Sequence, residues 1–222
     1  MTRETDANQI IEQLRCMANP ANVAGMARYG INPAQALGIS LPALRQMARG
    51  RRDHALAEAL WQSGIHEARI LAAMVDDSSQ VSPEQMERWV LDFDSWDVCD
   101  QVCSNLFDRT RDAVEKAHAW SQRPEEFIKR AGFVLMAALA VHDKKAGDGI
   151  FLDFLPVIQR EATDGRNFVK KAVNWALRQI GKRNPALRAA AIETARQIRT
   201  IDSPAARWIA ADALKELEAV NS

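Results

Sequence analysis

The segment 92–107, DFDSWDVCDQVCSNLF, contains a tryptophan and a carboxylate at a spacing that could serve chemistry. Trp96 and Asp100 are four residues apart, so on a helix they share one face. An aspartate beside a tryptophan, in a partly apolar setting, could stabilise a positive charge that develops on a ligand. The competing interpretation is an ordinary surface aspartate in an acidic region, and spacing alone favours it. The opposite, core-facing side of this helix would be Val98, Val102 and Leu106.

Other residues of this segment are expected to serve structure. Ser95 can cap the helix, and Asp97 would lie in its first turn, close to the positive end of the helix dipole. Cys99 and Cys103 have no partner ligands at zinc spacing, so they are interpreted as small core residues. The four histidines are scattered, and His66-Glu67 does not continue into a metalloprotease motif.

A second segment, 166–183 (RNFVKKAVNWALRQIGKR), is strongly basic. On a helical wheel, Trp175 lies away from the apolar stripe and within about 60° of Lys171. Phe168, two turns earlier, lies close to it. Trp175 and Phe168 either pack on a neighbouring helix beneath lysine stems, or form a stacking or cation–π platform beside a phosphate-binding strip. The buried stripe would be Val169, Val173, Ala176, Leu177 and Ile180.

A third segment, 125–144, becomes apolar on nearly every side after Arg130, which predicts a central helix. Arg130 stands at the edge of this buried run. Its guanidinium could pair with a carboxylate for structural reasons, or it could point into a cavity and hold a phosphate bidentately. Local sequence leaves both interpretations open.

The elements that would position these residues are helices. Proline-containing starts recur at Asn19-Pro20, Leu41-Pro42, Ser82-Pro83, Arg123-Pro124, Asn184-Pro185 and Ser203-Pro204, and Ser82 to Gln85 has the spacing of a capping box. Apolar spacings of three and four predict helices at 5–17, 20–28, 41–50, 54–63, 65–76, 83–93, 95–108, 111–121, 125–142, 149–163, 166–182, 185–199 and 203–219. No segment alternates like a strand. We expect a single all-α domain over 1–222, an α-solenoid of antiparallel helix pairs with a concave surface; a plain globular helical domain is the alternative.

Composition excludes several classes of protein. The 222 residues carry 29 basic and 29 acidic side chains, which argues against a histone-like protein. The zero net charge hides local asymmetry, because 76–100 holds eight acidic residues and one basic residue, whereas 166–183 holds six basic residues and no acidic residue. Three cysteines, no apolar signal core at the N-terminus and no apolar run long enough to span a bilayer predict a cytoplasmic protein.

Taken together, the three segments resemble the AlkD-like DNA alkylation repair glycosylases, most clearly over 37–214. The Trp-Asp-x-x-Asp stretch of that family, with its aromatic residue and catalytic carboxylate, matches 96–100. The active-site arginine of the family matches Arg130 within FIKRAGF, and its second tryptophan matches Trp175 within AVNWALRQIGKRNP. The opening region of the family is matched only by the character of GISLPALR, 38–45.

The resemblance implies a HEAT-like solenoid that grips duplex DNA in a concave basic groove and releases N3- or N7-alkylated purines in base excision repair. It implies no metal and no organic cofactor, and we expect a monomer that binds no membrane. The alternatives are a non-catalytic DNA-binding repeat protein that recognises distorted DNA, and a protein-binding helical scaffold. The expected catalytic residues are Asp100, Trp96, Trp175 and Arg130. The expected DNA-binding residues are Lys170, Lys171, Arg178, Lys182 and Arg183. All are expected to converge on one concave face.

Overall fold

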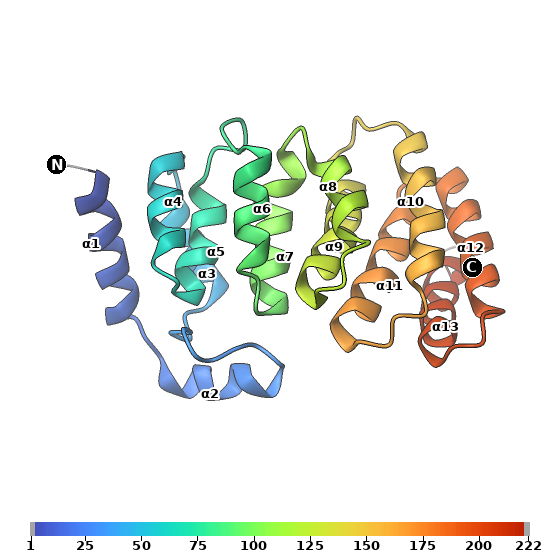
Figure 1. Cartoon of the computed structure of the whole chain (residues 1–222), viewed down its shortest axis with the longest axis horizontal. Coiled ribbons are helices and arrows are strands. Elements are labelled where there is room, and N and C mark those ends of the chain that lie inside the picture. The colour runs from blue at the N-terminus through green and yellow to red at the C-terminus, as the bar shows by residue number, and fades with distance from the viewer. Residues whose placement is uncertain (1–2, 220–222) are drawn as a thin grey trace. The chain divides into compact units, whose positions relative to one another are not determined.

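The computed structural model describes residues 3–219, which contain thirteen α-helices and no strand (Figure 1). The helices are α1 (Arg3–Cys16), α2 (Pro20–Arg28), α3 (Leu41–Ala48), α4 (His54–Gln62), α5 (His66–Val75), α6 (Pro83–Leu91), α7 (Trp96–Asn105), α8 (Ala113–Trp120), α9 (Glu126–His142), α10 (Asp148–Glu161), α11 (Asn167–Gly181), α12 (Pro185–Arg199) and α13 (Pro204–Ala219). Each predicted helix is confirmed. The largest difference lies after Asn105, where α7 ends and 107–109 forms a short 3-10 turn.

The cap signals explain why several of these bounds were predictable. The side chains of Asn19, Ser82 and Asn184 each accept a hydrogen bond from the backbone N–H three residues later. The predicted start at Arg123-Pro124 is wrong, because α9 begins at Glu126. Arg123 pairs with the side chain of Glu125 at 2.8 Å, and the Pro124 carbonyl accepts a hydrogen bond from an arginine at the start of α11, so this segment forms a connection outside the helix.

The chain divides into two compact units, residues 1–110 and 111–222. In the first unit α5 packs against α3, α4 and α7, and α1 packs against α4. Trp61 of α4 and Trp89 of α6 stack with ring centroids 3.9 Å apart and planes 6° apart. Phe93 and Phe107 extend this aromatic core toward the end of α7.

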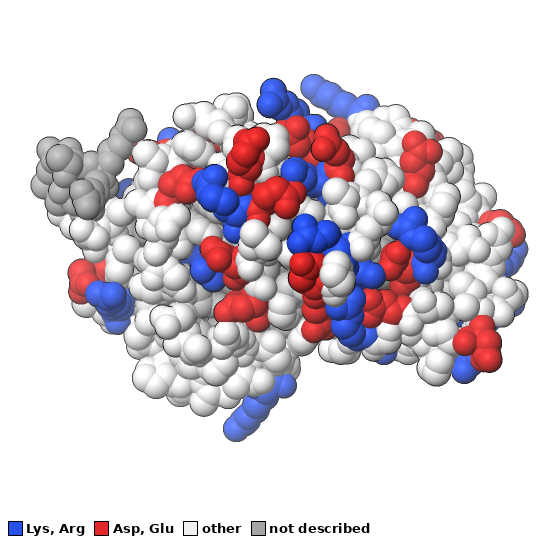
Figure 2. Space-filling view, viewed as in Figure 1, with Lys and Arg blue, Asp and Glu red and all other residues white. Residues whose placement is uncertain are grey.

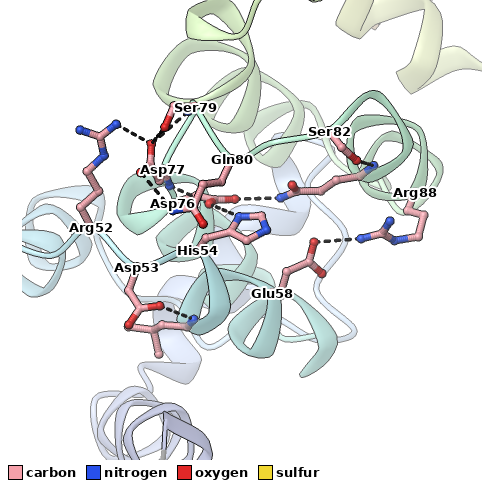
Figure 3. Close-up of polar contacts among 12 residues, drawn as sticks. Arg52, Asp53, His54, Glu58, Asp76, Asp77, Ser79, Gln80, Ser82 and Arg88 are labelled. Atoms are coloured by element: carbon pink, nitrogen blue, oxygen red, sulfur yellow. Dashed lines mark hydrogen bonds and ion pairs between the residues drawn. The ribbon is translucent and has the colours of Figure 1, made fainter.

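A buried carboxylate joins α4, α5 and α6 in the first unit (Figure 3). The side chain of Asp76 is completely buried; it accepts hydrogen bonds from Gln85 Nε2 at 2.8 Å and from the backbone N–H of Asp77 at 2.7 Å, and it contacts His54 Nδ1 at 2.7 Å. Burial raises the pKa of Asp76, although the hydrogen bonds from His54 and Gln85 oppose that shift. Gln85 therefore does not complete a capping box, because its side chain serves Asp76 rather than the start of its own helix.

The second unit is built from two layers of helices. Contacts among α8, α10 and α12 form one layer, and contacts among α9, α11 and α13 form the other. The apolar helix α9 is central, as its composition predicted, and it approaches α8 closely because Gly132 has no side chain; a Cβ atom there would lie 2.4 Å from the Ser121 nitrogen. Helix α11 lies between α9 and α13. Among residues 3–219 no helix combines the length and the apolarity needed to span a membrane.

Candidate functional site

Helix α7 presents Trp96 and Asp100 on the side away from the core, as the sequence predicted. Both side chains are half-buried. The Trp96 indole is fixed, since its Nε1 donates a hydrogen bond to the Tyr29 carbonyl at 3.0 Å. The predicted core stripe of this helix is confirmed, with Val98, Val102 and Leu106 buried.

The two cysteines of α7 lie under this surface, in the core, as predicted. Burial raises the pKa of the Cys103 thiol well above its usual range, and its contact with Cys99 and the negative charge of Asp100 add to the shift. Cys103 therefore stays a neutral thiol and is not a nucleophile at neutral pH. Asp100, which shares a face with Trp96, is therefore the candidate on this helix for acting on a bound ligand.

The connection that follows α2 is tied to the start of α7. Ser95 was predicted to cap this helix, but its buried hydroxyl makes no cap hydrogen bond. Instead, Ser95 Oγ accepts a hydrogen bond from the Asn32 backbone N–H at 2.8 Å, and Asn32 Nδ2 donates to Asp94 at 2.7 Å. Ser95 therefore occupies the predicted N-cap position, but its side chain does not cap the helix, because Asn32 takes its oxygen. Residues 29–32 are held against Trp96 as a result.

His66 and Asp97 form a pair that the sequence did not reveal. The Asp97 side chain was expected to serve the start of α7, but its Oδ2 lies 2.8 Å from Nε2 of His66, which is 4% exposed. Burial lowers the pKa of His66, but the hydrogen bond to Asp97 and the negative charges of Asp97, Glu67 and Asp94 outweigh burial and leave that pKa raised. No sequence signal links positions 66 and 97.

Next to this pair, the Glu67 carboxylate organises the loop that leads into α3. Glu67 is 1% exposed and accepts hydrogen bonds from the backbone N–H groups of Leu37, Gly38 and Ile39, at 2.8, 2.6 and 3.2 Å. Gly38 has φ +77°, and a Cβ atom there would lie 2.4 Å from the Asn19 carbonyl oxygen. The GISLPALR stretch therefore begins with a turn that requires glycine and a buried acceptor.

In the second unit, helix α11 carries the other candidate residues. Its predicted buried stripe is confirmed, since Val169, Val173, Ala176, Leu177 and Ile180 are all fully buried. Trp175 is half-buried and Lys171 is exposed. The Phe168 ring packs against Phe127 of α9, with centroids 5.6 Å apart. The packing interpretation is therefore confirmed for Phe168, whereas the role of Trp175 stays a prediction.

A row of side-chain contacts connects α11 to α13. Lys170 Nζ lies 4.7 Å from the Trp208 ring centroid, and Asn174 Nδ2 donates to Asp212 at 2.6 Å. The cations further along α11 have acidic partners. Arg178 Nη1 lies 2.6 Å from Glu216 Oε2 and 3.6 Å from Asp212 Oδ2, and Lys182 also pairs with Glu216. Burial raises the pKa of Glu216, but the contacts with Lys182 and Arg178 outweigh burial and leave that pKa lowered.

Two of the predicted arginines hold helices together. Arg130 is 5% exposed and donates from Nη1 to the Phe168 carbonyl at 2.6 Å, so it anchors the first turn of α11. Arg183 donates to the carbonyls of Ala140 and Ala146, at 2.8 and 3.2 Å, and lies over the Phe151 ring. Arg183 thereby places a cation at the C-terminal end of α9, where the helix dipole favours it.

On the face drawn in Figure 2, basic and acidic side chains are intermixed, and neither sign forms a continuous patch in that view. The pairs of Arg178 and Lys182 with Glu216 add to this mixing of the two signs. A continuous basic groove stays a prediction. So does the convergence of Trp96 and Asp100 with Arg130 and Trp175.

The chain resembles known proteins over almost its whole length. One solved structure, described as "A new family of proteins related to the HEAT-like repeat DNA glycosylases with affinity for branched DNA structures", is 18% identical in sequence and has a TM-score of 0.78. The match covers 96% of this chain and 94% of that one, and it shows that the chain has a HEAT-like repeat fold. No curated protein matches the sequence. The family model described as DNA alkylation repair enzyme matches residues 10–217, and the chain therefore belongs to this family.

Proposed function

We propose that this protein is a DNA glycosylase that hydrolyses the N-glycosidic bond of cationic N3- or N7-alkylated purines in duplex DNA. The observation that carries the proposal is the surface of α7, where Trp96 and Asp100 lie one helical turn apart and are both half-buried. The hydrogen bond from Trp96 to Tyr29 holds the indole in place before any ligand binds. Membership of the DNA alkylation repair enzyme family supports the same substrate class.

The main contribution of the protein to this reaction is electrostatic stabilisation of the positive charge that develops on the sugar. An N3- or N7-alkylated purine carries a positive charge, so the base leaves with the electron pair of the C1′–N bond and becomes neutral. The sugar develops oxocarbenium character, which the negative charge of Asp100 stabilises. Water then adds to C1′, and the carboxylate of Asp100 accepts the proton that the water loses. The products are a free base and an abasic site.

The other residues have supporting roles in this proposal. The indoles of Trp96 and Trp175 present aromatic faces that favour the cationic base and sugar. Arg130 acts through α11, because it holds the backbone of Phe168 at the start of that helix. Lys170 and Lys171 contact DNA phosphates directly. Further contacts come from Arg178 and Lys182 once phosphate replaces Glu216, while Arg183, whose guanidinium binds two carbonyls, adds only its charge.

A single assay tests the proposal. Excess protein is incubated with duplex DNA containing 7-methylguanine or 3-methyladenine, and base release is followed over one turnover beside equilibrium binding to the same duplex. We expect release well above the rate without protein. Absence of release from every alkylated duplex would contradict the glycosylase proposal.

The second candidate function is non-catalytic recognition of branched DNA. The solved structure described as having affinity for branched DNA structures favours it, because its fold covers nearly all of this chain. In this case the protein would bind a four-way junction more tightly than a linear duplex of the same sequence and would release no base. The two functions are therefore distinguished by adding a junction to the binding measurement.

A further inference from the structure

Trp208, in the first turns of α13, has the most exposed side chain of the six tryptophans. It is 40% exposed, whereas Trp61, Trp89 and Trp120 are buried and the remaining two tryptophans are half-buried. The core-facing residues of α13 are Ala205, Ala206, Ile209, Ala210, Ala213, Leu214 and Leu217. Trp208 lies outside that stripe, and burial in the core does not account for it.

A lysine lies over the Trp208 ring. Lys170 Nζ lies 4.7 Å from the ring centroid, within the range of a cation–π interaction, and Lys171 beside it is exposed. Among the side chains that the structure describes, those of 6–219, neither lysine forms an ion pair. The other end of α11 differs, because there Arg178 and Lys182 are both paired with Glu216.

The register of α11 and α13 places Lys170 and Trp208 on the same surface as the candidate phosphate contacts. Asn174 and Arg178 meet residues 38 positions later in the chain, and Lys170 meets Trp208 at the same offset. A constant offset means that α11 and α13 run side by side in the same direction. Trp208 therefore continues the row formed by Asp212 and Glu216, with an aromatic ring where the later positions have carboxylates.

We propose that Trp208 and Lys170 form a subsite for an unpaired nucleotide, with the base stacked on the indole and the ammonium group bound to the adjacent phosphate. The inference rests on the proposed DNA-binding function and adds the class of DNA that is bound. Every base has a π face, so such a subsite is tolerant of sequence. In a fully paired duplex the bases stack on each other and are not available to the ring. The subsite therefore favours DNA with unpaired nucleotides at an end or a branch.

The first experiment compares a blunt duplex with the same duplex extended by a short unpaired tail, using fluorescence anisotropy. We expect the tail to raise the affinity of the wild-type protein. Trp208→Ala should weaken binding of the tailed DNA by about tenfold, the order expected for loss of one base–aromatic stack, and should change blunt-duplex binding by less than about twofold. Trp208→Phe should keep most of the affinity because it retains a stacking face. Leu152→Ala, which removes another large exposed side chain, is the matched control.

The second experiment separates the ring from the ammonium group. Lys170→Met should lower the salt dependence of tailed-DNA binding by about 0.7 in log–log slope, the value for one contact to single-stranded phosphate. With 2-aminopurine in the tail, the wild-type protein should quench its fluorescence and Trp208→Ala should not. Unchanged binding by Trp208→Ala, an equal loss on both DNAs, or no effect of the tail on wild type would overturn the subsite. Failure of wild type to bind either DNA would instead overturn the proposed DNA-binding function.

Discussion

Arg178 of α11 donates to Glu216 of α13 across 2.6 Å, so one of the candidate phosphate-binding cations has a counter-charge within the protein. Glu216 also pairs with Lys182, and Asp212 lies 3.6 Å from Arg178. All of these side chains are partly exposed, so the pairs contribute little to stability. Their consequence is electrostatic, because the carboxylates lower the positive potential that α11 offers to a DNA backbone.

Neutralising Glu216 should strengthen DNA binding. In Glu216→Gln, Lys182 loses its acidic partner and Arg178 keeps only the longer contact with Asp212, so both cations become more available to phosphate. We expect a higher affinity for duplex DNA and a salt slope steeper by about one unit, which corresponds to roughly one further phosphate contact. Glu218→Gln, also on α13, breaks an exposed pair with Arg196 of α12; it is the control and should change neither quantity. Weaker binding by Glu216→Gln would mean that Glu216 instead holds Arg178 in its binding position.

The buried Glu67 carboxylate should be important for stability. Glu67→Gln replaces one acceptor oxygen by an NH2 group that can only donate, and a loop N–H of Leu37, Gly38 or Ile39 then loses its partner without access to water. We expect the free energy of unfolding, measured by urea denaturation, to fall by about 1–3 kcal/mol. Glu58→Gln removes a partly exposed pair with Arg88 and should cost less than about 1 kcal/mol. Equal effects of the two substitutions would contradict the capping role of Glu67.

The pair of His66 and Asp97 should make stability depend on pH near neutrality. The folded state raises the pKa of His66 above its ordinary 6.5, so folding favours the protonated imidazole. This stabilisation is fully present below pH 6.5 and is lost as the pH rises through the folded pKa. The melting temperature should therefore fall over that interval in wild type. Asp97→Asn should flatten the profile, while His142→Gln, which alters an exposed histidine, should leave it unchanged; a flat wild-type profile would contradict the linkage.

The helices were predictable because their signals are local. Apolar spacing and the caps at Asn19, Ser82 and Asn184 act within a few residues, and the helices of the structure lie close to the bounds that these signals predict. The prediction failed at Ser95, whose oxygen is taken by Asn32, 63 positions earlier in the chain. A capping signal describes one turn of helix and contains no information about such a distant competitor.

The candidate site was predictable to a similar extent. The shared face of Trp96 and Asp100 follows from their spacing of four, and the half-burial of both agrees with it. The role of the α11 cations in DNA binding stays a prediction, and their pairing with Glu216 could not be predicted, because Glu216 belongs to another helix of the fold. Trp208 could have been found from the sequence, since a helical wheel of 204–219 separates it from the stripe that contains Ile209 and Ala213.

Trp175 should affect catalysis more than stability. Its indole is half-buried on the same side of α11 as the exposed Lys171. Trp175→Ala should cost about 0.5–2 kcal/mol of transition-state stabilisation, the size of a cation–aromatic interaction, measured as single-turnover base release. Phe168→Ala is the comparison, because its ring packs on Phe127 and its removal should lower the melting temperature instead. A large loss of melting temperature in Trp175→Ala would support a packing role.

Asp100 is the residue that separates the glycosylase from a DNA-binding relative. Asparagine has nearly the same shape but no charge, so Asp100→Asn should leave the melting temperature nearly unchanged and should not weaken DNA binding, since one negative charge is removed from a surface that faces phosphates. Single-turnover base release should fall about a hundredfold, as expected when one preorganised electrostatic group is lost. Asp153→Asn, at an exposed position of α10, is the better control, because Asp97 pairs with His66 and its loss would disturb the fold. Full activity of Asp100→Asn would show that the catalytic carboxylate is another residue.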